Sequence, residues 1–231
     1  MSVRYALYCA PRPDEALAAF ARGWLGYDPD TGHAVRPTPA DSLPAELRLR
    51  AVTEPRRYGF HGTLKAPFAL AAGITEAELL RATAGFARRR SPVTMRLELK
   101  ALAGFLALVP ADPAPGLVDL AADCVRDFDR FRAPPDSATL ARRRAAGLSE
   151  RQDVLLVRWG YPYVLEEFRF HMTLTGALPD GERDLVRDTL IALAGPLWQA
   201  LVSIRDLVVF IQPAPAAPFR VLQRVALGDG P

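Results

Sequence analysis

Two short stretches of this 231-residue chain carry the side chains best suited to chemistry. The first reads Phe60-His61-Gly62-Thr63-Leu64 and the second reads Phe170-His171-Met172-Thr173-Leu174. The whole chain has only three histidines, and two of them occupy the same place in this pattern. A histidine exchanges protons near neutral pH, so a pair can supply one base and one acid. The pattern therefore predicts acid–base chemistry at a site that both stretches share.

The threonines of the two stretches fit the same site. Side chains alternate along a strand, so His61 and Thr63 share one face, as do His171 and Thr173. The Phe and Leu of each stretch then lie on the opposite, core face. Threonine hydroxyls can hydrogen-bond the non-bridging oxygens of a ligand held by both imidazoles. This set suits displacement at phosphorus, where positioning and charge neutralisation supply most of the catalysis.

A single histidine in a strand is usually structural, and threonine is a common strand residue. The repetition changes this judgement, because the two histidines stand at equivalent points of a duplicated unit in a histidine-poor chain. We therefore interpret all four polar motif residues as functional.

Hydrophobic periodicity predicts the elements that position the two motifs. Expected strands are residues 3–9, 58–66, 93–99, 104–109, 169–175, 202–211 and 219–227, and expected helices are 14–25, 75–89, 116–131 and 180–197. The order strand–helix–strand–strand occurs twice, at 58–109 and at 168–227, which indicates an internal duplication. We expect an α+β protein whose two mainly antiparallel sheets flank a central groove.

The duplication predicts one bilobal domain over residues 1–231. Its first motif lobe would cover about 58–131, and its second about 154–227 together with the N-terminal strand and helix. The segment 27–57, which contains His33, is expected to be largely irregular, and the segment 133–151 is expected to be a charged, proline-containing connector with one helix. The first of them has a short helical piece near 45–51.

Composition bounds the class of protein. Half of the residues are apolar, which is enough for a sizeable core, and no apolar run is long enough for a bilayer. The N-terminus lacks a signal-peptide pattern. Cys9 and Cys124 stand far apart without metal-ligand spacing, which favours a reducing cytoplasm. The net charge is +3 with arginine as the main cation, which suits an anionic ligand. We expect a cytoplasmic monomer that binds no membrane.

The stretches F-H-G-T-L and F-H-M-T-L resemble the paired H-x-T-x motifs of the 2H phosphoesterase superfamily. The longer run Y-G-F-H-G-T-L-K-A-P-F at 58–68 resembles the branch encoded beside bacterial phosphonate-utilisation genes. This resemblance implies two ferredoxin-like lobes related by a pseudo-two-fold axis, with one motif from each lobe in the cleft. It also implies hydrolysis of a cyclic phosphodiester without a metal or other cofactor. His61 and His171 would then be the acid–base pair, and Thr63 and Thr173 would bind the phosphate.

Strand alternation adds two candidate substrate contacts. Lys65 follows Thr63 by two positions and Arg169 precedes His171 by two, so both belong on the cleft face if no bulge intervenes. Either cation would suit an anionic group of the substrate, although the Lys65 ammonium could equally reach solvent. By the same count, Tyr58 falls on the core face.

Three functions are compatible with these residues. The favoured one is the opening of a ribose cyclic phosphate such as 5-phosphoribosyl 1,2-cyclic phosphate, whose additional phosphate would pair with basic side chains. The second is hydrolysis of RNA 2′,3′-cyclic phosphate ends. The third is a module that binds a nucleotide or RNA without turnover, but no strand is both basic and rich in aromatic residues. The expected partner is therefore a small phosphorylated sugar or nucleotide, with RNA less favoured.

Overall fold

The computed structural model describes residues 3–228, so both ends of the expected 1–231 domain lie outside the described residues. The strands are β1 (Arg4–Cys9), β2 (Tyr27–Asp28), β3 (His33–Ala34), β4 (Gly62–Phe68), β5 (Val93–Leu102), β6 (Phe105–Pro110), β7 (Met172–Thr173), β8 (Leu201–Ile204), β9 (Asp206–Gln212) and β10 (Arg220–Ala226). The α-helices are α1 (Ala16–Leu25), α2 (Ala45–Arg56), α3 (Glu76–Ala87), α4 (Pro115–Asp127), α5 (Ser137–Arg144), α6 (Glu150–Trp159) and α7 (Asp180–Gln199).

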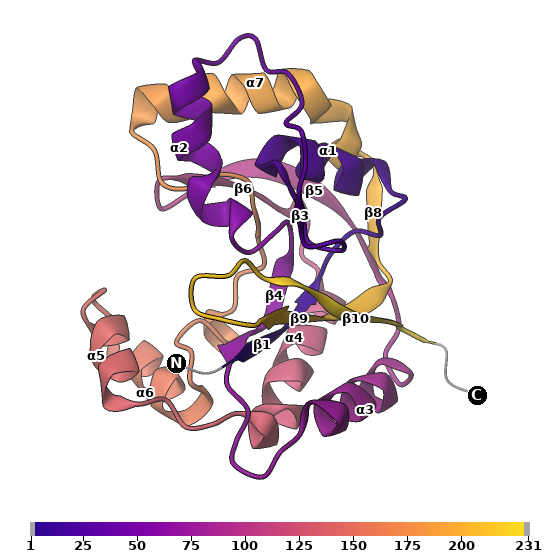
Figure 1. Cartoon of the computed structure of the whole chain (residues 1–231), viewed down its shortest axis with the longest axis vertical. Coiled ribbons are helices and arrows are strands. Elements are labelled where there is room, and N and C mark those ends of the chain that lie inside the picture. The colour runs from indigo at the N-terminus through magenta and orange to yellow at the C-terminus, as the bar shows by residue number, and fades with distance from the viewer. Residues whose placement is uncertain (1–2, 229–231) are drawn as a thin grey trace.

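Eight of these strands form one sheet in the order β10-β9-β1-β4-β7-β6-β5-β8. The two motif strands, β4 and β7, are neighbours at its centre. Helices α3 and α4 cover the half that contains β1, β4, β9 and β10, whereas α1, α2 and α7 lie with the other half (Figure 1). The pairings between strands of the described chain are antiparallel. The predicted α+β class with mainly antiparallel strands in two halves is thus confirmed.

The strands are shared between the halves differently from the predicted lobes at 58–131 and 154–227. Strand β6 pairs with β7 and β5 pairs with β6, so both lie on the side of the second motif. Strands β9 and β10 lie on the side of the first motif, beside β1. Each half is therefore assembled from both parts of the sequence, and the two parts exchange strands.

The exchange occurs inside the segment 202–211, which was predicted to be one strand. It is two strands, because β8 ends at Ile204 beside β5 and β9 begins at Asp206 beside β1. The buried Asp206 carboxylate accepts hydrogen bonds from Nε and Nη2 of Arg12 at 2.8 and 2.7 Å. A run of residues that pairs first with one strand and then with another has the same hydrophobic periodicity as a single strand. The sequence pattern therefore did not reveal that 202–211 passes from one half of the sheet to the other.

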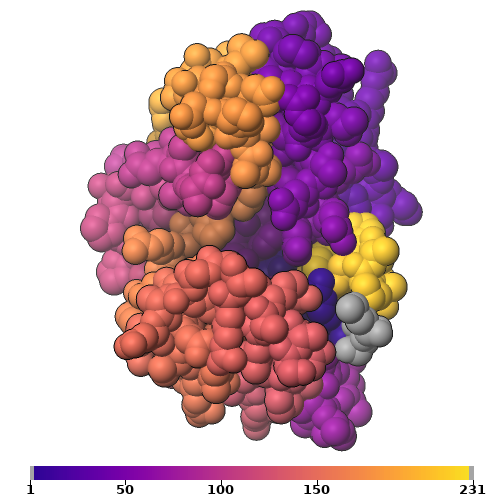
Figure 2. Space-filling view, turned by 90° about the vertical axis from the view of Figure 1, so that its left-hand side faces the viewer, coloured from indigo at the N-terminus to yellow at the C-terminus, as the bar shows by residue number. Residues whose placement is uncertain are grey.

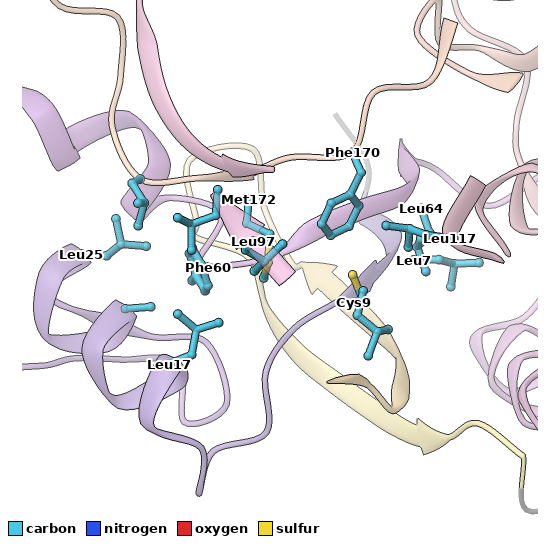
Figure 3. Close-up of a cluster of buried hydrophobic side chains, with 14 of the residues drawn as sticks. Leu7, Cys9, Leu17, Leu25, Phe60, Leu64, Leu97, Leu117, Phe170 and Met172 are labelled. Atoms are coloured by element: carbon cyan, nitrogen blue, oxygen red, sulfur yellow. The ribbon is translucent and has the colours of Figure 1, made fainter. Parts of the chain in front are cut away.

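Both motifs send their apolar side chains into the core, as alternation predicted. The buried motif residues, each at most 8 % exposed, are Phe60, Leu64, Phe170 and Leu174. Figure 3 shows Phe60 on the side of Leu17 and Leu25 of α1, whereas Phe170 points toward Cys9 of β1. The histidine and threonine of each motif are only half-buried. The sheet therefore holds the motif backbones between a dry core and an accessible polar face.

Contact between the motifs requires a glycine at position 62. A Cβ added there would stand 2.3 Å from Cε2 of Phe170 and 3.0 Å from Sγ of Cys9. The equivalent position of the second motif holds Met172, which is buried. The two copies differ at this position because the Phe170 ring packs directly on the backbone of β4.

Replacing Gly62 with alanine should therefore destabilise the fold. We expect the free energy of unfolding to fall by about 1–3 kcal/mol, the usual cost of overpacking a core. The thermal midpoint should fall by about 2–4 °C per kcal/mol, measured by circular dichroism. Gly181→Ala in α7 is the matched control, since a Cβ there meets no atom within 4 Å. Equal midpoints for the two variants would contradict the predicted clash with Phe170.

Candidate active site

The four polar motif residues surround the point where the two halves of the sheet meet. Gly62 of β4 stands opposite Met172 of β7 in an antiparallel register. One residue away in each direction, the same register sets His61 across from Thr173 and Thr63 across from His171. The two copies are thus related by an approximate two-fold axis through the Gly62–Met172 pair. Each histidine lies across from the threonine of the other motif.

The two imidazoles are held in the same way. Nδ1 of His61 lies 2.9 Å from the Gly59 carbonyl oxygen, and Nδ1 of His171 lies 2.8 Å from the Arg169 carbonyl oxygen. A carbonyl oxygen only accepts hydrogen bonds, so each Nδ1 carries a proton and donates it. In the neutral ring Nε2 is then the atom that can take up a proton. The matching hydrogen bonds leave both histidines with Nε2 available for proton transfer.

Gly59 shapes the entry into the first motif. Its φ is +71°, and a Cβ at this position would stand 2.8 Å from Cβ of Pro29. The turn ends the extended conformation before His61, so the strand alternation does not extend back to Tyr58. The count along the strand had placed Tyr58 on the core face, and this prediction is wrong. The half-buried ring of Tyr58 stacks on Phe219 and lines the cavity beside His61.

The ring of His61 packs against aromatic side chains. It stacks on the ring of Tyr8 at 3.7 Å between centroids, and the ring of Phe210 lies 6.0 Å away. The pKa of His61 is lowered to about 4, chiefly by burial and to a smaller extent by the nearby charge of His171, against the opposing effect of the Gly59 carbonyl. His61 is therefore neutral at neutral pH, and Thr63 Oγ1, 3.3 Å from Nε2, can donate to it. Sequence analysis did not identify Tyr8, because a contact between residues far apart in the sequence produces no local motif or spacing that would indicate it.

A cavity of about 270 Å³ opens beside these residues. His61 and Thr173 line one part of it, and Glu54, Tyr58 and Phe105 form much of the remainder. Figure 2 shows a hollow in the surface between the residues of α2 above and those of α5 and α6 below. His171 adjoins the cavity through Phe105, since their ring centroids are 5.7 Å apart. The lining of the cavity thus includes one residue of each motif, His61 and Thr173, whereas Thr63 and His171 lie outside the lining.

The second motif strand is shorter than the predicted 169–175, and other contacts hold its flanks. Trp24 Nε1 donates a hydrogen bond to the Leu174 carbonyl at 2.8 Å, and the Gly176 amide donates to the Ala51 carbonyl at 2.7 Å. The hydroxyl of Thr175, which is fully buried, accepts a hydrogen bond from the Leu106 amide at 2.9 Å. These contacts fix the second motif against α1, α2 and β6 without regular strand pairing.

Lys65 does not reach the cavity. Between Thr63 and Lys65 the pairing with β1 shifts by one residue, and such a bulge redirects the side chains that follow it. The Lys65 ammonium donates to the Val125 carbonyl at 3.0 Å and lies 3.6 Å from the Asp129 carboxylate. Burial lowers the pKa of Lys65 to about 8, although Asp129 opposes this effect. The side chain is 3 % exposed, so it neither reaches solvent nor lines the cavity, contrary to both alternatives for this residue.

Arg169 and His33 also lie apart from the lining of the cavity. The Arg169 side chain is exposed, and it is the backbone carbonyl of this residue that positions His171. A contact of its guanidinium with substrate stays a prediction. His33 is exposed on β3, in a separate two-stranded sheet with β2.

Residues 3–228 contain no group of three or more His, Cys, Asp and Glu side chains placed to hold a metal ion. Within the same range, no helix combines the length and the apolar character needed to cross a membrane.

Two curated proteins align with nearly the whole chain. Both are called ribose 1,5-bisphosphate phosphokinase PhnN. The protein of Janthinobacterium sp. (strain Marseille) is 39 % identical over 227 residues, and that of Laribacter hongkongensis (strain HLHK9) is 35 % identical over 228 residues. The alignments cover 96 % and 97 % of this chain but 50 % and 52 % of those proteins. This chain therefore spans about half the length of these relatives.

Among solved structures, E. coli LigT complexed with NADP+ is 16 % identical with a TM-score of 0.44, and the alignment covers 98 % of both chains. E. coli LigT complexed with 3′-AMP is 17 % identical with a TM-score of 0.42, covering 98 % of this chain and 99 % of that one. Likeness at this level carries no argument about activity. Residues 63–220 match the family model described as a protein of unknown function, DUF1045, and together with the curated relatives this shows that the chain belongs to the DUF1045 family.

Proposed function

We propose that this chain is a cyclic phosphodiesterase that works without a metal and opens a ribose cyclic phosphate such as 5-phosphoribosyl 1,2-cyclic phosphate. One observation carries the proposal. Two histidines related by an approximate two-fold axis both bond a backbone carbonyl through Nδ1, which leaves both Nε2 atoms available. A threonine of the other motif lies across from each of them. This geometry supports the assignment of a base, an acid and two hydroxyl donors to one phosphate.

In this proposal the low pKa of His61 makes it the base, and His171 is then the acid. Neutral His61 takes a proton from water through Nε2 as the water oxygen attacks phosphorus. The bond between phosphorus and O2 of the ribose breaks, and O2 receives a proton from Nε2 of His171. Thr63 and Thr173 donate hydrogen bonds to the non-bridging oxygens. Attacking and leaving oxygens lie roughly in line, which fits a base and an acid on opposite sides of the phosphate.

The name of the curated relatives supports the substrate class. Opening 5-phosphoribosyl 1,2-cyclic phosphate between phosphorus and O2 yields ribose 1,5-bisphosphate, the compound in that name. The same name also raises a second hypothesis, that this chain is a kinase, which we favour less. A phosphate-binding loop of the form G-x-x-x-x-G-K-[ST] needs a lysine after glycine. The lysines of this chain, Lys65 and Lys100, both follow leucine.

Phosphorus NMR of the reaction products tests the proposal. The protein is incubated separately with 5-phosphoribosyl 1,2-cyclic phosphate and with an oligoribonucleotide that ends in a 2′,3′-cyclic phosphate. We expect the first compound to give ribose 1,5-bisphosphate, and the second to react much more slowly. Faster opening of the RNA 2′,3′-cyclic phosphate would show that the RNA end, and not the ribose cyclic phosphate, is the preferred substrate. Binding of both compounds without conversion would support a non-catalytic module instead.

The pH dependence of kcat/KM tests the assignment of His61 as the base. Protonation of His61 removes its acceptor, so the rate should fall as the pH drops through the pKa of His61, about 4. An ordinary imidazole base would already lose activity near about pH 6.5. At high pH the rate should fall again, because the acid must be protonated, which gives a bell-shaped profile. An acidic limb near pH 6.5 in folded protein would contradict the assignment of His61 as the base.

A further inference from the structure

The cavity beside His61 contains a carboxylate where an anion-binding site would be expected to hold cations. Its lining includes Glu54 but neither a lysine nor an arginine. The remaining wall is mostly uncharged and apolar, with Tyr58, Phe105 and Pro55 as its large members. A phosphate bound at His61 and Thr173 would therefore have an acidic side chain as its charged neighbour. This arrangement needs an explanation in terms of the substrate.

Glu54 is held at the cavity by the packing of α2. The Gly176 amide donates to the Ala51 carbonyl at 2.7 Å, which joins the last turns of α2 to the chain after the second motif. A Cβ added to Gly176 would lie 3.9 Å from Cβ of Glu54, so the two backbones are close. The Glu54 side chain is exposed, and no ion pair or hydrogen bond of its carboxylate occurs within residues 3–228. Its oxygens are thus free to accept hydrogen bonds from a ligand.

The electrostatics decide what kind of group can occupy this space. A second phosphate in the cavity would meet the Glu54 carboxylate with no cation in the lining to offset the repulsion. A neutral group with hydroxyls meets no such cost, because an ionised carboxylate is an acceptor for up to several donors. The ring of Tyr58, from the turn between α2 and β4, and the ring of Phe105, from β6, provide apolar surfaces for the carbon face of a sugar ring.

We propose that Glu54 accepts hydrogen bonds from the free ring hydroxyl of the substrate's sugar, which lies in the cavity against Tyr58 and Phe105. The inference rests on the proposed cyclic phosphodiesterase function and adds the orientation of the substrate. The ring hydroxyl points to the end of α2, and the second phosphate points out of the cavity. Glu54 is thereby a specificity-determining residue that selects a neutral, hydroxyl-bearing group and rejects a second anion at this position.

The test compares 5-phosphoribosyl 1,2-cyclic phosphate with its 3-deoxy analogue. Wild-type protein should lose about 10–100-fold in kcat/KM on the analogue, the usual effect of a hydrogen bond to a charged group. Glu54→Ala should show a similar loss on the parent compound, mainly in KM, and no further loss on the analogue. Glu54→Gln should lie between them, because an amide oxygen still accepts one hydrogen bond. Glu46→Gln is the control, since Glu46 is exposed on the same helix outside the cavity lining.

The outcomes separate this inference from the function on which it rests. Equal turnover of both compounds by wild-type protein would overturn the role of Glu54 and leave the proposed activity intact. The role of Glu54 would also be overturned, with the proposed activity intact, if Glu54→Ala preferred the parent compound over the 3-deoxy analogue as strongly as wild-type protein does. Failure of wild-type protein to open either compound would contradict the proposed function, and the inference with it.

Discussion

Alanine in place of His61 or His171 is expected to lower kcat by about 10²–10⁴-fold, the contribution of one positioned acid or base. Each variant removes one of the two Nε2 atoms that accept or donate a proton in the proposed mechanism. The fold should survive, because both rings are only half-buried and each bonds a carbonyl of its own segment. Rates on 5-phosphoribosyl 1,2-cyclic phosphate, together with circular dichroism, measure both effects.

The third histidine provides a matched control for this experiment. His33 is exposed on β3, so His33→Ala should keep the wild-type rate. The double variant of His61 and His171 should lose less than the product of the single effects, because residues that act as a unit are not additive. A near-normal rate for either single motif variant would show that the acid–base assignment is wrong.

Valine in place of Thr63 or Thr173 is expected to lower kcat by about 10²–10³-fold, as the loss of one charge-stabilising donor does elsewhere. Valine keeps the branched shape and the preference for strands, so stability should change little. Serine at either position should restore much of the rate, because it returns the hydroxyl. Thr94→Val is the control, since the exposed Thr94 hydroxyl of β5 lies 2.8 Å from the Ser203 hydroxyl of the edge strand β8 and does not line the cavity. A large fall in the thermal midpoint with an unchanged rate would instead make these threonines structural.

The local parts of this fold could be predicted from the sequence. The helix at 75–89 was predicted from its periodicity, and α3 begins with a capping box in which the Thr75 hydroxyl and the Glu78 carboxylate make both hydrogen bonds. The alternation of buried and half-buried residues in both motifs was predicted from a period of two. Such features depend on neighbours within a few residues, so the sequence pattern contains them directly.

Features that depend on tertiary pairing could not be predicted in this way. The bulge that turns Lys65 away arises from the register of β4 against β1, and no local pattern marks it. The division of 202–211 at Arg205 depends on which partners each half of the run finds. In the same way, the stacking of Tyr8 on His61 and the position of Glu54 join segments that are separate in sequence. These contacts lower the pKa of His61 and place Glu54 at the cavity, so the acid–base residues could be predicted from the sequence but their surroundings could not.

Turnover under exhaustive chelation tests the central claim most directly. The rate on 5-phosphoribosyl 1,2-cyclic phosphate is measured across pH with and without an excess of chelator, followed by additions of single divalent ions. Because imidazoles and hydroxyls perform every step of the proposed mechanism, we predict the same rate and the same bell-shaped profile in both series. Loss of turnover on chelation, restored by one specific ion, would contradict the two-histidine mechanism even if both histidines proved essential, since they could then be metal ligands.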